Sequence, residues 1–197
     1  MKQDNILGYI LIIFVLGMTL KVYLDSDAFN LKCIISEVDG NSYCVRERNK
    51  INLVADLLAH VTTDLKHLVQ HMSEKYPDRS NTKLLVQNFN PQTVKEILPT
   101  SKYTAYSENK GEKLAFCVTK KKHGNNIIDR NTLTFVAIHE LAHICTKSIG
   151  HKDEFWGNFK FLLENAKEIN IYNPEDYKRK PKEYCGMKIT DNPYYDL

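Results

Sequence analysis

Two histidines and a glutamate stand close together at His139, Glu140 and His143, in the sequence HELAH. Residues four apart on an α-helix lie on the same face, so both imidazoles can reach one tetrahedral zinc ion. Glu140 lies about 100° around the helix from His139. Its carboxylate is poorly placed to be an equal ligand but can take a proton from a metal-bound water. The pattern predicts a zinc site with Glu140 as general base.

A catalytic zinc site needs a third protein ligand and keeps one position open for water. His151 directly follows Gly150, where the chain can fold back over the metal, and we expect it to be that ligand. The rival arrangement uses a carboxylate from the following helix. The candidates for that role are Glu164 and Glu168, with Asp153 and Glu154 as weaker choices.

The helix that carries these residues is predicted from its ends and its apolar side. Asp129 or Asn131 can cap it, and it should continue through both histidines to about Ser148 before Gly150 ends it. Apolar side chains cover the opposite side: Ala137, Ile138, Leu141, Ile144 and Cys145. We expect that side to be buried, so that the ligand face opens on a cleft.

Two further helices are predicted to support the site helix. One lies between Arg46 and Tyr76 and is stopped by Pro77; the other runs from about Asp153 to Ile169. The apolar face of the first comprises Val54, Leu57, Leu58, Val61, Leu65, Leu68, Val69 and Met72. The buried side of the second should comprise Phe155, Trp156, Phe159, Leu162, Leu163 and Ala166.

Three other histidines, His60, His67 and His71, lie about 120° from the apolar face of the long helix. His67 and His71 are four residues apart, a spacing that can bind metal. No acidic base lies between them, however, and no third ligand is near in the sequence. We interpret all three as solvated polar residues.

The remaining elements are predicted to be strands and coil. Residues 31–46 form a hairpin pattern around Asp39 and Gly40, and residues 103–119 form a second one with its turn at 108–111. Residues Lys83–Phe89 are also predicted to be a strand. The C-terminal tail, which is rich in proline and tyrosine, is predicted to be coil packed on the domain.

The site region resembles the WLM and SprT-like zinc metallopeptidases. The match consists of His139-Glu140-Leu141-Ala142-His143, then Gly150-His151 and Phe155-Trp156, against the pattern H-E-L-x-H…G-H…F-W. The resemblance implies that the three histidines bind zinc and that Glu140 is the base. It also implies that the aromatic pair packs the helix bearing the third ligand.

The same resemblance implies an α+β fold, a zincin-like minimal metalloprotease domain with an active-site helix, a small mostly antiparallel sheet and supporting helices. One departure is the spacing: seven residues separate His143 from His151, whereas related families use shorter or longer connections. The tail from Tyr184 to Tyr195 is also similar to uncharacterised WLM-like proteins encoded by large DNA viruses of algae and protists.

Near the N-terminus, residues 6–20 carry no charge, and the apolar character resumes after Lys21. Residues 6–24 as a helix would be about 28 Å long, close to the hydrocarbon thickness of a bilayer. No small-residue cleavage site follows, so we favour a single-pass membrane anchor over a cleaved signal peptide. Flanking lysines do not decide its orientation. The predicted organisation is an anchor at 1–24, a linker and hairpin at 25–50, and a metallopeptidase domain at 51–197.

The composition excludes a disordered or a collagen-like protein. Hydrophobic residues make up 43% and charged residues 26%, as in globular proteins, and the net charge of +3 does not indicate a nucleic-acid partner. Five cysteines are too few for a disulfide scaffold. Cys33 and Cys44 flank the first predicted turn and could bridge in an oxidising compartment, although reduced thiols fit equally well.

The predicted activity is hydrolysis of peptide bonds in a protein or peptide, with Zn²⁺ as cofactor. Zinc would lower the pKa of its water from about 15.7 toward 7, while Glu140 would pass the proton to the leaving amine. The predicted strand Leu114–Thr119 could hold an extended peptide at the cleft edge. A tyrosine that stabilises the oxyanion is expected among Tyr172, Tyr177, Tyr184, Tyr194 and Tyr195.

Two other functions compete with this prediction. One is a non-catalytic, membrane-anchored structural or virion component that keeps the zinc fold, against which the intact Glu140 argues. The other is a protease associated with DNA, which the family resemblance suggests. The predicted anchor and the absence of a zinc knuckle or a strongly basic domain argue against it. The sequence does not indicate an oligomeric state.

Overall fold

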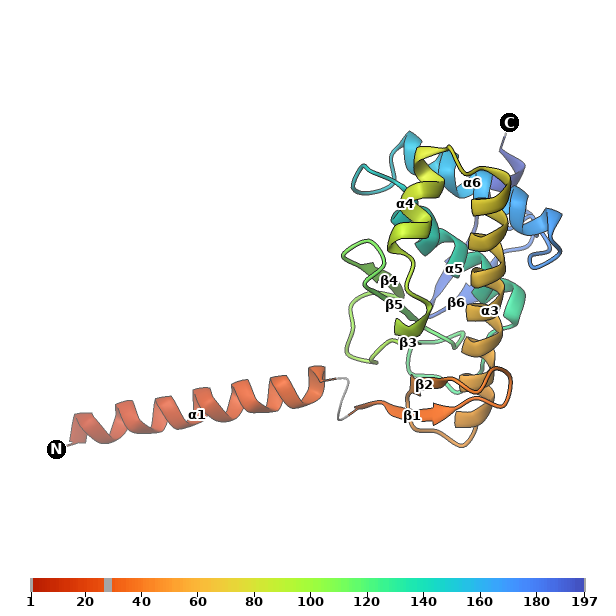
Figure 1. Cartoon of the computed structure of the whole chain (residues 1–197). Coiled ribbons are helices and arrows are strands. Elements are labelled where there is room, and N and C mark those ends of the chain that lie inside the picture. The colour runs from red at the N-terminus through yellow and green to blue at the C-terminus, as the bar shows by residue number, and fades with distance from the viewer. Residues whose placement is uncertain (1, 27–29, 197) are drawn as a thin grey trace.

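The computed structural model describes residues 2–26 and 30–196, and it is an α+β protein with small sheets (Figure 1). Its described α-helices are α1 (Lys2–Asp25), α3 (Ile51–Lys75), α4 (Ser80–Asn88), α5 (Arg130–Cys145) and α6 (Asp153–Glu168). Its described strands are β1 (Lys32–Ile35), β2 (Ser42–Val45), β3 (Val94–Glu96), β4 (Ala105–Glu108), β5 (Lys113–Phe116), β6 (Lys182–Tyr184) and β7 (Met187–Ile189). Residues 27–29 of the predicted linker, and residues 1 and 197, lie outside the described part.

Helix α1 projects away from the rest of the protein (Figure 1). Its segment Ile6–Leu24 has a mean hydropathy of 2.1 and none of it is buried. By length and composition it could cross a membrane, although a signal sequence would pass the same test. The side-chain amide of Asn30 caps its end by donating to the carbonyl oxygens of Tyr23 and Ser26, both at 2.9 Å.

The first predicted hairpin is confirmed. Strands β1 and β2 pair antiparallel with Cys33 opposite Cys44, and a disulfide joins these two residues. Gly40 has a positive φ of 70° in the connecting segment, where a residue without a Cβ fits best. The sequence left open whether Cys33 and Cys44 are reduced or oxidised; in the structure they are oxidised to a disulfide.

The core forms where α3, α4 and α6 pack against α5. Most of the predicted apolar face of α3 is buried, and Leu57 and Val69 are partly buried at its margin. Asp64, a buried carboxylate on α3, receives hydrogen bonds from Arg130 Nε at 2.9 Å and Nη2 at 2.5 Å. This two-point contact fixes the N-terminus of α5 on α3.

A three-stranded sheet lies beside α5 in the order β3-β5-β4. Strand β3 runs parallel to β5, and β4 pairs antiparallel with β5, which confirms the second predicted hairpin. Its turn contains Asn109, Lys110 and Gly111, all with positive φ. A Cβ on Gly111 would lie 2.3 Å from the carbonyl oxygen of Asn88, so only glycine fits against the end of α4.

The prediction of a strand at Lys83–Phe89 is wrong, because these residues belong mostly to helix α4. Thr82 and Leu85, three residues apart, are buried on one face of that helix. A short apolar run does not distinguish a strand from a helix by its periodicity. Here packing against α3 and α5 favours the helix.

The C-terminal tail contains more regular structure than the coil that was predicted. Strands β6 and β7 form a hairpin whose turn residues, Cys185 and Gly186, both have positive φ. Their backbone N–H groups donate to Thr119 and Lys120, at 2.9 and 2.7 Å. A second disulfide joins Cys185 to Cys117, so the hairpin is fixed to the end of the central strand.

Candidate metal centre

Helix α5 holds the predicted site residues in a fixed position. The carboxylate of Asp129 accepts hydrogen bonds from the backbone N–H of Thr132 at 2.9 Å and from its hydroxyl at 2.8 Å. Asp129 rather than Asn131 is therefore the cap. The helix ends at Cys145, before the predicted Ser148. The five predicted apolar side chains opposite the histidines are all buried.

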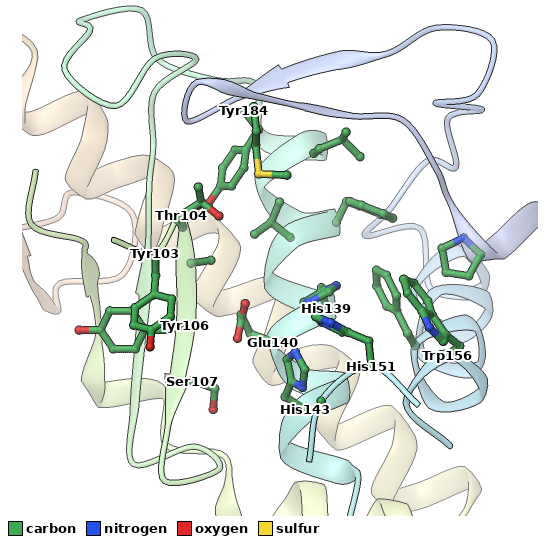
Figure 2. Close-up of a pocket in the computed structure, with 18 of the residues that line it drawn as sticks. Tyr103, Thr104, Tyr106, Ser107, His139, Glu140, His143, His151, Trp156 and Tyr184 are labelled. Carbon is green, nitrogen blue, oxygen red and sulfur yellow. Dashed lines mark hydrogen bonds between the residues drawn. The ribbon is translucent and has the colours of Figure 1, made fainter. Parts of the chain in front are cut away.

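Three histidines converge on one point in front of α5 (Figure 2). The ligand atoms of His139, His143 and His151 all lie within 4.8 Å of one another, and the Nε2 atoms of His139 and His151 are 3.1 Å apart. His139 and His143 are half-buried, whereas His151 is exposed on the loop that follows α5. This cluster could hold a metal ion.

The carboxylates considered as rival ligands lie outside this cluster and outside the cavity around it. Glu168 forms an ion pair with Lys75 on α3. Glu154 accepts hydrogen bonds from the backbone N–H groups of Lys147 and Ser148, at 3.2 and 3.1 Å. Glu164 and Asp153 are exposed.

The environment keeps the two helical histidines neutral. Burial, together with the neighbouring His143 and His151, lowers the pKa of His139 to about 3. Burial also lowers the pKa of His143 to about 4, with contributions from His151 and the ammonium group of Lys110. Neutral imidazole is the form that binds metal, so these side chains are ready to act as ligands at neutral pH.

Glu140 lies between α5 and β4, next to the histidines (Figure 2). Glu140 is only 6% exposed, and this burial raises the pKa of its carboxyl group to about 8. A backbone hydrogen bond from Ser107 on β4 acts in the opposite direction and ties the carboxyl group to the strand. The carboxyl group is thus held beside the cluster and can take up a proton.

A cavity of about 1050 Å³ surrounds these residues. It is lined by the segment 103–110, by α5, by the loop 148–151 and by residues 187–191, which comprise β7 and the two residues after it. Its size exceeds that of most small-molecule sites. The cavity can therefore accommodate several residues of an extended polypeptide.

The strand at the cavity edge is β4 and not the predicted strand at Leu114–Thr119. Strand β5 lies in the middle of the sheet, with β3 and β4 on its two sides. The backbone N–H of Cys117 donates to Thr104 at 2.9 Å, and residues along an antiparallel pair alternate between bonded and non-bonded positions. The peptide groups of Ala105 and Ser107 consequently face away from β5, toward the free edge.

Of the five tyrosines considered as oxyanion stabilisers, Tyr184 lines the cavity and the other four do not. Its hydroxyl donates to the carbonyl oxygen of Thr104 at 3.0 Å, and burial raises its pKa well above the usual value. Tyr172 and Tyr177 pack against Phe135 beneath α5. Sequence reasoning missed the cavity residues Tyr103, Tyr106 and Lys110, which become neighbours of the cluster only through the sheet.

The aromatic pair at the start of α6 has two different environments. Phe155 is fully buried, and its ring centroid lies 4.8, 4.3 and 4.6 Å from those of His139, His143 and His151. Trp156 was predicted to be buried but is 42% exposed, because it lines the open cavity beside His151 instead of the core.

The histidines of α3 stay apart from the cluster. His67 is exposed, as predicted. His60 and His71 differ from the prediction, because both are half-buried. The Nε2 atom of His71 lies 3.2 Å from Oδ1 of Asn165 on α6.

One relative extends over most of the chain. The uncharacterised protein R325 of Acanthamoeba polyphaga mimivirus is 30% identical over 161 residues, which cover 80% of this chain and 81% of that protein. The chain belongs to the R325 family. No family model matches the sequence, and no solved structure matches it.

Shorter matches link the R325 family to other large DNA viruses. The uncharacterised protein 136R of Invertebrate iridescent virus 6 is 36% identical over 75 residues, or 38% of this chain and 41% of that protein. The uncharacterised protein 042R of Invertebrate iridescent virus 3 is 38% identical over 85 residues, or 42% of this chain and 50% of that protein. These relatives carry no described activity.

Proposed function

We propose that this protein is a zinc-dependent peptidase anchored in a membrane by α1. The observation that carries the proposal is the convergence of three imidazoles next to a buried glutamate in a cavity wide enough for a polypeptide. Three histidines that leave one position open form a donor set typical of catalytic zinc. The resemblance of the HELAH, GH and FW motifs to the WLM and SprT-like peptidases supports the same assignment.

The site residues have separate roles in the proposed reaction. His139, His143 and His151 would hold zinc, which when bound supplies a Lewis acid and an activated water. Glu140 takes the proton of the attacking water on its carboxylate and delivers it to the nitrogen of the leaving amine. Burial raises the pKa of the Glu140 carboxyl group, which makes its carboxylate a stronger base.

The substrate class follows from the cavity edge. The peptide groups of Ala105 and Ser107 face the free side of β4, so an extended chain can add to the sheet there by main-chain hydrogen bonds. The N–H of Ser107 already bonds Glu140, which leaves its carbonyl and both groups of Ala105 for the substrate. Main-chain recognition of this kind suits a peptide or an unfolded protein segment.

The decisive experiment is Glu140→Gln in the full-length protein. This variant is expected to keep its zinc and lose cleavage of a pool of quenched fluorescent peptides by at least about 100-fold, since general base catalysis contributes 10²–10⁴-fold. Glu164→Gln, an exposed carboxylate outside the cavity, is the matched control and should cleave normally. Equal cleavage by wild type and Glu140→Gln, or a wild-type protein without bound metal, would overturn the proposal.

The anchor is tested separately. If α1 spans the membrane, protein recovered from membranes by detergent will have the intact mass of all 197 residues. It will also resist extraction by alkaline carbonate. A shorter chain that begins after Leu24 would instead identify the segment as a removed signal sequence.

A further inference from the structure

Two residues outside α1, Asn30 and Thr100, form hydrogen bonds to the C-terminal end of this helix. Asn30 binds the carbonyl oxygens at the end of α1, and β1 begins two residues later at Lys32. The hydroxyl of Thr100, in the loop before β4, donates to the carbonyl oxygen of Leu24 at 3.4 Å. Leu24 is the last residue of the apolar segment. If α1 crosses a bilayer, the Thr100 loop therefore lies at the level of the lipid headgroups.

Two segments that line the cavity lie on the side of the domain from which α1 projects. In Figure 1, α1 projects from one side of the domain, and the green turn between β4 and β5 and the cyan connection between α5 and α6 lie along that same side. Both segments contribute residues to the cavity, including Lys110 from the turn and His151 from the connection. A bilayer around α1 would thus run close to these two segments of the cavity lining.

The exposed residues of the cavity lining on this side have the composition of a membrane interface. Ile149, in the α5–α6 connection, is 85% exposed, and Tyr103, three residues after Thr100, is 54% exposed. Both line the cavity. Lysines flank them: Lys102 precedes Tyr103, and Lys147 and Lys152 surround Ile149, all three exposed. Apolar and aromatic side chains among lysines are typical of surfaces that contact headgroups and anionic lipid.

We propose that the cavity opens onto the surface of the membrane that α1 spans, with Tyr103 and Ile149 resting in the headgroup layer, and that the substrate is the membrane-adjacent segment of another membrane-anchored protein. This inference rests on the proposed peptidase function and on the anchor. A cavity at this height meets a tethered chain where it leaves the bilayer. A bulky soluble protein reaches it less easily.

Contact with lipid is tested in the full-length protein reconstituted into vesicles of phosphatidylcholine and phosphatidylglycerol. A fluorophore attached at Ile149→Cys should be quenched by lipids that carry a nitroxide on the headgroup. Leu53→Cys is the matched control, because Leu53 is 58% exposed on α3 and lies outside the cavity. Cys145 is buried and will not take the label. Quenching that is equally weak at both positions would overturn the membrane contact.

The substrate class is tested with one cleavable sequence presented in three ways: free in solution, next to a transmembrane helix, and at the end of a long flexible spacer after that helix. Cleavage next to the helix should be at least about tenfold faster than at the end of the spacer. Equal rates at the two tethered positions would overturn the substrate assignment. Failure to cut any of the three, including the free peptide, would instead overturn the peptidase function and would leave the quenching result to stand alone.

Discussion

Phe155 forms the apolar floor under the cluster of three histidines. Its ring lies against all three histidine rings and is fully buried. A rigid neighbour restricts the directions in which the imidazoles can point, and the hydrophobic shell around a metal site limits the access of water. The FW motif was expected only to pack the following helix. Its first residue, Phe155, instead contacts the three candidate ligands directly.

The identity of the third ligand is a prediction at this scale. His151→Ala should weaken zinc binding by more than about 100-fold, because the loss of an outer-shell partner alone costs 10–100-fold. Glu164→Ala should leave zinc binding unchanged, since Glu164 is exposed and outside the cavity. Competition with a chromophoric chelator measures both affinities. Zinc retained by His151→Ala and lost by Glu164→Ala would reverse the assignment.

The sequence could predict the cluster because its geometry is local. His139 and His143 share a helix face by periodicity alone, and His151 follows a helix-ending glycine within one loop. The exposure of Trp156 could not be predicted, because a large aromatic residue beside core positions looks the same whether it faces the core or an open cavity. Tyr103 and Tyr106 had no local signal either.

At the scale of elements, α5 is fixed in place by the contact between Asp64 and Arg130. Asp64→Ala should lower the free energy of unfolding by about 1–3 kcal/mol, the cost of losing hydrogen bonds to a buried charged group. This loss of stability is smaller than for a fully buried ion pair, because the Arg130 side chain is 49% exposed and its guanidinium group can be hydrated in the variant. Asp78→Ala is the control: it removes a surface pair with Lys83 and should change stability by less than about 0.5 kcal/mol in urea unfolding.

The two disulfides should differ in their effects on stability. Cys117 and Cys185 are 68 residues apart, whereas Cys33 and Cys44 are 11 apart. Loop-closure entropy gives about 4 kcal/mol for the longer loop and about 3 kcal/mol for the shorter. Replacing Cys117 and Cys185 by alanine should also slow cleavage, because the released β6–β7 hairpin forms one cavity wall. Unchanged cleavage, measured with the free peptides, would show that the hairpin holds its position without the bond.

Elements were predictable where their own pattern was strong. The long periodicity of α3 and the turn residues of the β4–β5 hairpin identified both. Helix α4 was missed because the seven residues Lys83–Phe89 are too few to show whether the apolar positions repeat as in a helix or as in a strand. Its helical conformation depends on packing against α3 and α5, which are distant in the sequence. The order of strands, which places β4 rather than β5 at the edge, is likewise a tertiary property.

For the whole molecule, we expect from the two disulfides that the domain matures in an oxidising environment. Denatured protein that has not been reduced should take up one alkylating label, on Cys145, and reduced protein should take up five. Mass spectrometry counts the labels. Five labels without reduction would place the domain in a reducing compartment and would remove the expected difference in stability between the two bridges.

Gly111 makes one side of the cleft resistant to evolutionary change. Any larger residue there would collide with the end of α4, and the ammonium group of Lys110 beside it bonds the carbonyls of Thr146 and Lys147 after α5. A lineage that altered this turn would disturb β4, and with it Glu140. We therefore expect relatives of this chain in the R325 family to keep a glycine at the position of Gly111.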